Sequence, residues 1–208
     1  MSDNSTQINY NIPNIKNKFI TADFVNGLLE EYDLQNVKIN DIDKYILASI
    51  HKYYTINDEN VTFDELSEEE LANAIPLQKE NNERLEFLGD SILYSAITSY
   101  IYDRYFYKNE GFLTKLRTKL VNGETLAVLA KELKLYEYIL ISKHIENNDG
   151  RQNLNLMEDI FEALICSINL DLGFKYAEKF ILTNIGKNIN NFFLFIFNCI
   201  GLFFTKFI

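Results

Sequence analysis

Three acidic residues share a short segment that is otherwise largely apolar. Glu83, Glu86 and Asp90 follow one another at intervals of three and four residues, so on a helix they lie along one face. Apolar side chains occupy most of the remaining circumference, namely Leu85, Phe87, Leu88, Ile92 and Leu93. Like charges at this spacing repel, and burying them without a partner costs on the order of several kcal/mol. A bound cation is the simplest compensation, and a plain solvated helix face is the alternative.

A second acidic segment repeats this pattern further along the chain. Asp159 and Glu162 are three residues apart, and apolar residues fill the other faces of the stretch 160–165. Two such helices facing each other would form a cage of oxygen atoms, which suits Mg²⁺ or Mn²⁺. Neither histidine, His51 or His144, has a serine or cysteine beside it in a known nucleophile motif. Hydrolysis by a metal-activated water molecule is therefore the chemistry that remains for these residues.

Gly89 lies in the middle of the first acidic segment. A glycine inside a helix costs about 1 kcal/mol relative to alanine, and it usually marks the close approach of another backbone. We therefore expect a second helix to pack against this position.

The elements that carry these acids are predicted to be helices. The chain has two prolines and eight glycines in 208 residues, and long stretches carry apolar residues at helical spacing. Helical stretches are expected at 24–29, 39–54, 81–107, 112–121, 124–132 and 156–182, with a loop from Ser142 to Asn155. The sequence thus predicts an all-α fold.

The length of the chain fits one domain with short appendages. We expect a polar N-terminal arm at 1–23, a helical catalytic domain at 24–190 and an apolar tail at 191–208. The tail is a membrane anchor, an extra packed helix or foreign sequence, and these alternatives stay open. The arm lacks a signal-peptide pattern, so we expect the cytoplasm or the nucleus. Cys166 and Cys199 lie among apolar residues and are predicted to be buried thiols.

Residues 82–91, with the sequence NERLEFLGDS, resemble the signature motif of the ribonuclease III family without a substitution. Two further segments follow in the family's order, because 110–117 and 159–165 resemble its next motif and the segment with its second acidic pair. Upstream, the family's usual Thr-His-x-Ser appears here as Ile50-His51-Lys52-Tyr53. The resemblance covers residues 24 to 185 or so. It implies a ribonuclease III-type endonuclease domain, a helical bundle that forms a two-fold dimer.

The resemblance also implies a role for each acid. Mg²⁺, for which Mn²⁺ can substitute, would be bound by Glu86, Asp90, Asp159 and Glu162. Glu83 and Glu110 would be catalytic residues that support the site without binding the metal. Two metal ions would then hydrolyse double-stranded RNA and leave 5′-phosphate and 3′-hydroxyl ends, in RNA processing or silencing. The alternative is a catalytically silent member of the family that acts as a structural or RNA-binding module.

Phe87 is, by the same resemblance, the residue that would project into the partner of a homodimer. The alternative is that it belongs to the core of its own chain.

The net charge of −10 opposes RNA binding through phosphate neutralisation. Much of this charge lies in a predicted acidic loop at about 55–80, which we interpret as a solvated segment. The best basic surface is Lys115, Arg117 and Lys119, although a solvated helix face explains it as well. Because nothing after Asp171 resembles a double-stranded-RNA-binding domain, a separate RNA-binding protein is a further expected partner.

Overall fold

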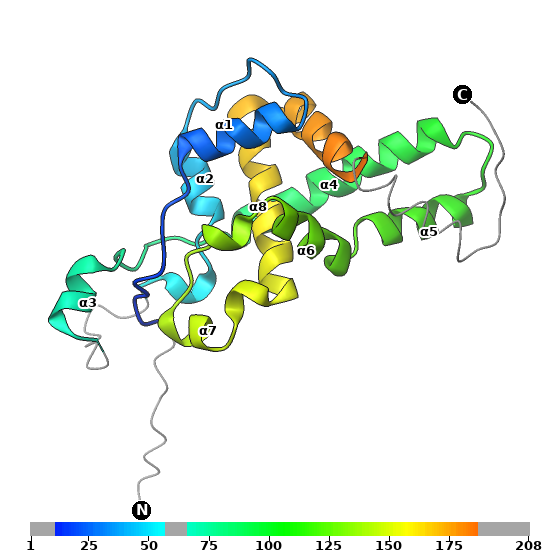
Figure 1. Ribbon diagram of the computed structural model, residues 1–208. Coiled ribbons are helices and arrows are strands. Elements are labelled where there is room, and N and C mark those ends of the chain that lie inside the picture. The colour runs from blue at the N-terminus through cyan, green and yellow to red at the C-terminus, as the bar shows by residue number, and fades with distance from the viewer. Residues whose placement is uncertain (1–10, 57–65, 187–208) are drawn as a thin grey trace, which may run out of the picture.

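The computed structural model describes residues 11–56 and 66–186, which form a bundle of helices (Figure 1). The helices are α1 (Ala22–Glu31), α2 (Ile42–Ala48), α3 (Glu68–Asn73), α4 (Glu83–Arg104), α5 (Glu110–Leu120), α6 (Gly123–Glu132), α7 (Lys143–Asn147) and α8 (Leu154–Leu172). A further helical segment covers 174–186, and short 3-10 turns lie at Lys52–Tyr54, Leu135–Glu137 and Gly150–Gln152. Strand-like pairing among the described residues is limited to two isolated bridges, Ile50 with Leu140 and Thr55 with Gln78. The predicted all-α fold is confirmed.

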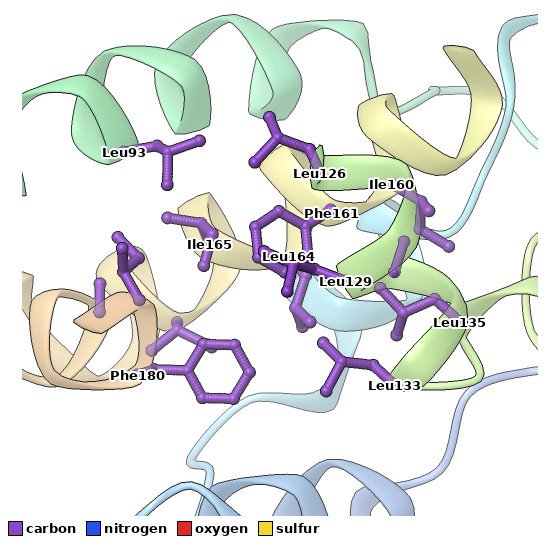
Figure 2. Packing of buried hydrophobic residues seen from close by; sticks show 14 of the residues in the cluster. Leu93, Leu126, Leu129, Leu133, Leu135, Ile160, Phe161, Leu164, Ile165 and Phe180 are labelled. Atoms are coloured by element: carbon purple, nitrogen blue, oxygen red, sulfur yellow. The ribbon is translucent and has the colours of Figure 1, made fainter. Parts of the chain in front are cut away.

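Helix α8 lies at the centre of the bundle. Its middle, from Ile160 to Ile168, is buried at every position, and it packs against α2, α4 and α6. A helix that is apolar on nearly all sides is stable only when other elements cover it all round. Figure 2 shows the side chains that meet there, among them Leu93 of α4, Leu126 and Leu129 of α6, Phe161, Leu164 and Ile165 of α8, and Phe180. This core fixes α4 and α8 relative to each other.

Helices α4 and α5 form an antiparallel pair that contacts along its length. Figure 1 shows the pair running away from the other helices. Near its far end the aromatic residues Tyr102, Phe106 and Tyr107 are exposed.

Helix α8 ends at Leu172, and Gly173 interrupts the helical conformation. Gly173 has a φ of 99°, a conformation that glycine adopts far more readily than other residues, and its N–H donates to the carbonyl of Asn169. The single helical stretch expected over 156–182 is therefore two helices. The loop expected from Ser142 to Asn155 likewise contains the short helix α7.

The described part of the N-terminal arm packs onto the helical domain. Asn11 Nδ2 donates to the carbonyl of Thr55 at 2.8 Å, and Asn17 Nδ2 donates to the carbonyl of Ile141 at 2.9 Å. Ile12 is buried as well. The helical domain therefore includes residues from Asn11 onward, upstream of the boundary at residue 24 that the polar composition suggests.

Part of the acidic segment at 55–80 is ordered as helix α3. Ser67 and Glu70 form a capping box, in which each side chain accepts from the other residue's backbone N–H. The rest of the predicted loop, residues 57–65, lies outside the described residues. So does the apolar tail at 191–208, and within the described ranges no helix has the length and apolar character needed to cross a membrane.

Candidate active site

The site begins where α4 crosses α8. A Cβ atom on Gly89 would lie 2.6 Å from the carbonyl carbon of Glu162, which is closer than real side chains pack. Only glycine therefore allows the two backbones to approach this closely, as predicted from its place in the sequence. The crossing sets the first acidic segment directly against the second.

The start of α4 is fixed by Asn82, which is 2% exposed. Its backbone N–H donates to the carbonyl of Ile50 at 2.9 Å, and its Nδ2 donates to the carbonyl of Ala48 at 3.3 Å. Asn82 makes no side-chain cap for α4. Its role is to attach the acidic end of α4 to the segment after α2, a role that the motif match alone did not reveal.

An open cleft of about 680 Å³ lies at this crossing. Five acids from two helices line it, namely Glu83 and Glu86 of α4 and Glu158, Asp159 and Glu162 of α8. Asp90 does not line the cleft, but it follows Gly89, whose backbone lies against that of Glu162, and its charge raises the pKa of both Glu158 and Glu162. The structure thus brings together five of the six predicted catalytic acids, counting Asp90.

Glu110 is the sixth predicted acid, and the described chain does not bring it to the cleft. It lies in the first turn of α5, is exposed, and accepts a hydrogen bond from Thr114 Oγ1 at 2.8 Å. Within a single chain, Glu110 therefore acts at the first turn of α5, where it accepts this hydrogen bond.

Burial and mutual repulsion both act on the acids of α8. Glu162 is 7% exposed, and burial, followed by the charges of Asp90 and Glu158, raises its pKa to about 8. Burial and the charge of Glu86 raise the pKa of Asp159 to about 7. Burial likewise raises the pKa of Glu86, with a further contribution from Glu83. These carboxyl groups are costly to ionise unless positive charge reaches them.

The donor set fits a hard divalent cation. It consists of carboxylate oxygens, and among the ion pairs of the described chain only one neutralises a cleft acid, Glu83 with Lys52. Within the same residues, no group of three or more His, Cys, Asp or Glu side chains has the arrangement of a formed metal site.

The carboxyl group of Glu158 lies beside Gly123 of α6. A Cβ atom on Gly123 would lie 2.9 Å from the carboxyl carbon of Glu158. Glu158 therefore occupies the space beside the first residue of α6 that a side chain would fill. Glu158 also lines the cleft, although it was not among the predicted site residues.

Three neighbouring residues that the sequence did not select also line the cleft, namely His51, Lys52 and Tyr53. His51 is buried, and burial, together with the charge of Lys52, lowers its pKa to about 4. Its Nδ1 accepts from the backbone N–H of Tyr53 at 3.4 Å. His51 is thus a neutral structural residue at neutral pH.

Phe87 lies on α4 but points away from the chain's own core, because 77% of its surface is exposed. The alternative that Phe87 packs within its own chain is therefore wrong. Of the predicted RNA-contacting residues, Lys115 and Lys119 are exposed on α5. Arg117 instead packs on α4, where it donates to Thr98 Oγ1 at 3.2 Å and lies over the ring of Tyr94.

The fold is that of an all-α nuclease domain. A nuclease domain of ribonuclease III from Campylobacter jejuni superposes with a TM-score of 0.63 and 31% sequence identity, over 78% of this chain and 96% of that one. A second structure of that domain gives a TM-score of 0.61 and 32% identity, over 77% and 92% of the two chains. The family model described as Ribonuclease-III-like matches residues 69–189, and the chain belongs to this family.

Curated relatives agree with this assignment. A probable ribonuclease 3 of Acanthamoeba polyphaga mimivirus is 34% identical over 81% of this chain, and ribonuclease 3 of Borreliella afzelii is 41% identical over 56%. The chain spans 31% of the first relative and 48% of the second. Ribonuclease 3 of Clostridium tetani is 36% identical over 77% of this chain and 62% of its own length.

Proposed function

We propose that this chain is a divalent-metal-dependent endoribonuclease that cleaves double-stranded RNA. The observation that carries the proposal is the cleft at the Gly89 crossing, which acids of α4 and α8 line. The chain that forms this cleft belongs to a family of ribonucleases. The alternative of a catalytically silent module is not favoured, because every acid of the family motifs is present.

The proposed reaction is hydrolysis of one phosphodiester bond. Two Mg²⁺ or Mn²⁺ ions held by Glu86, Asp90, Asp159 and Glu162 would supply charge to activate the water and to stabilise the leaving 3′-oxygen. The water oxygen bonds to phosphorus, the bond from phosphorus to the 3′-oxygen breaks, and a proton passes to that oxygen. The products carry 5′-phosphate and 3′-hydroxyl ends. The buried Glu162 fixes the inner wall of the site, and Gly89 keeps the two acidic helices together.

The proposed active form is a homodimer. One of the solved relatives is described as having a region involved in dimer formation. Phe87 and Leu88 are exposed on α4, one turn or less from the acids of the cleft. A partner that covers this face would place two clefts close together, which suits a substrate with two strands.

The direct test is cleavage of long double-stranded RNA by purified protein with and without Mg²⁺. We expect Mg²⁺-dependent cleavage that Asp90→Asn and Glu162→Gln each reduce by about 100-fold or more, as loss of a charged transition-state contact typically does. Asp103→Asn is the matched control, because Asp103 lies exposed on the same helix away from the cleft. Wild-type activity in both cleft variants would overturn the assignment.

A further inference from the structure

Lys52 is the only positively charged residue among those that line the cleft in the described chain. Its Nζ lies 3.6 Å from Glu83 Oε1, and 48% of the Lys52 side chain is exposed. The opposing lining contains five carboxylates, so a phosphodiester that approaches the cleft meets strong like charge. Lys52 is the side chain there whose own charge attracts a phosphate.

The backbone of Lys52 is held firmly in place. Its carbonyl accepts from Thr55 Oγ1 at 2.7 Å, and the preceding N–H of His51 donates to the carbonyl of Leu140 at 3.1 Å. The same short segment anchors α4, because Ile50 accepts from the N–H of Asn82. The ammonium group is therefore carried by a flexible side chain whose backbone is fixed beside the acids.

The pair of Lys52 with Glu83 is suited to exchange. Both side chains are about half exposed, so the ion pair is weak and water already competes for it. A lysine ammonium is a compact charge with three donors and a common binder of phosphate. Exchanging the carboxylate for a phosphate oxygen would keep Lys52 paired.

We propose that Lys52 is a substrate-contacting residue, whose ammonium group leaves Glu83 on RNA binding and pairs with a backbone phosphate next to the scissile bond. This inference rests on the proposed function. It explains how a chain with a net charge of −10 admits a polyanion into a cleft of acids. The contact is to phosphate, so Lys52 adds affinity and alignment without base preference.

The test compares binding of double-stranded RNA to Lys52→Ala and to its parent, both in the Glu162→Gln background with Mg²⁺ to slow cleavage. We expect about 10-fold weaker binding. The slope of log K against log salt should fall by about 0.9, the value for one phosphate contact on a duplex. Lys38→Ala is the matched control, since Lys38 forms an ion pair with Glu30 at 2.8 Å and similar exposure, outside the cleft. An unchanged slope in Lys52→Ala would overturn the inference.

A second comparison separates phosphate contact from support of Glu83. In a Glu83→Gln background, Lys52→Ala should still weaken RNA binding and still lower the salt slope. If both effects vanish there, Lys52 acts only by holding Glu83, and the inference is wrong. Failure of the proposed function looks different, because wild-type protein would then not cleave double-stranded RNA with Mg²⁺. If the wild type cleaves RNA but Lys52→Ala changes neither the affinity for RNA nor the salt slope, this inference is wrong and the proposed function stands.

Discussion

The backbone of Gly89 on α4 lies directly against the backbone of Glu162 on α8. The position of Glu162, a proposed metal ligand, thus depends on the absence of a side chain on the opposite helix. A single methyl group at position 89 forces the two helices apart and widens the cleft that their acids share.

Gly89→Ala should therefore lower the free energy of unfolding by about 1–3 kcal/mol, as overpacking of a tight contact does. Gly27→Ala is the matched control. Gly27 lies on the exposed side of α1 with nothing near its missing Cβ, so alanine there should stabilise the protein by up to about 1 kcal/mol. Urea unfolding of both variants measures the difference. Equal effects at the two positions would show that the helix crossing is not tight.

The buried acids of α8 should make the metal-free protein less stable as pH rises. Their pKa values of about 7 and about 8 lie above the ordinary values of 3.8 and 4.5, so the folded protein binds protons more readily than the unfolded chain. This stabilisation is complete below the unfolded pKa and is lost as pH rises through the folded pKa.

Glu162→Gln removes one of these groups. The melting temperature of this variant relative to that of the wild type should therefore rise between pH 5 and pH 8. Thermal melts in chelator across this range provide the measurement. A difference in melting temperature that stays constant with pH would contradict the raised pKa of Glu162.

Added metal should restore the stability that the metal-free protein loses as pH rises, because the cation pairs with the ionised acids. We expect the melting temperature of the wild type to rise with millimolar Mn²⁺ or Mg²⁺, by mass action on the folded state. Asp90→Asn should respond much less, because one ligand charge is gone. Asp90→Asn should also melt above the wild type in chelator, since one of several crowded charges has been removed. A metal-free wild type whose melting point ignores Mn²⁺ would count against the site.

Arg151 ties the N-terminal arm to the loop before α8. It pairs with Glu146 at 2.7 Å, and it donates to the carbonyls of Tyr136 and Ile139 and to Asn17 Oδ1. Arg151→Met should cost about 1–3 kcal/mol of unfolding free energy, because the carbonyls of Tyr136 and Ile139 would lose this donor and Glu146 would keep, among the described residues, only Lys16 and Asn14 as partners.

The exposed Arg104 on α4 is the control for this substitution. Arg104→Met should change the unfolding free energy by less than about 1 kcal/mol. A similarly small change for Arg151→Met in denaturant unfolding would show that the arm contributes little to the fold.

Phe87→Glu should dissociate the proposed dimer, since a charge would replace an apolar group at the centre of the contact. Sedimentation equilibrium should then show a monomer with an unchanged circular dichroism spectrum. Val128→Glu is the control, because Val128 is exposed on α6. A wild type that is already monomeric at micromolar concentration would exclude this assembly.

The sequence predicted the parts of the site that depend on local periodicity. Acids three and four residues apart on α4 were placed together correctly, and Gly89 marked the crossing. Lys52 was missed because it reaches the cleft through tertiary packing, for which spacing along one helix gives no signal. Glu158 was missed although it lies four residues before Glu162 on α8, a helical spacing that could have identified it. Spacing likewise gave no signal for the contacts of the arm, in which the polar Asn11 and Asn17 donate to distant carbonyl groups.

The contact between Gly123 and Glu158 makes two distant positions depend on each other. A Cβ atom at position 123 would lie 2.9 Å from the carboxyl carbon of Glu158, so the end of that flexible side chain would have to shift. A substitution at position 123, on a helix that carries none of the acids lining the cleft, should therefore change where the Glu158 carboxylate lies.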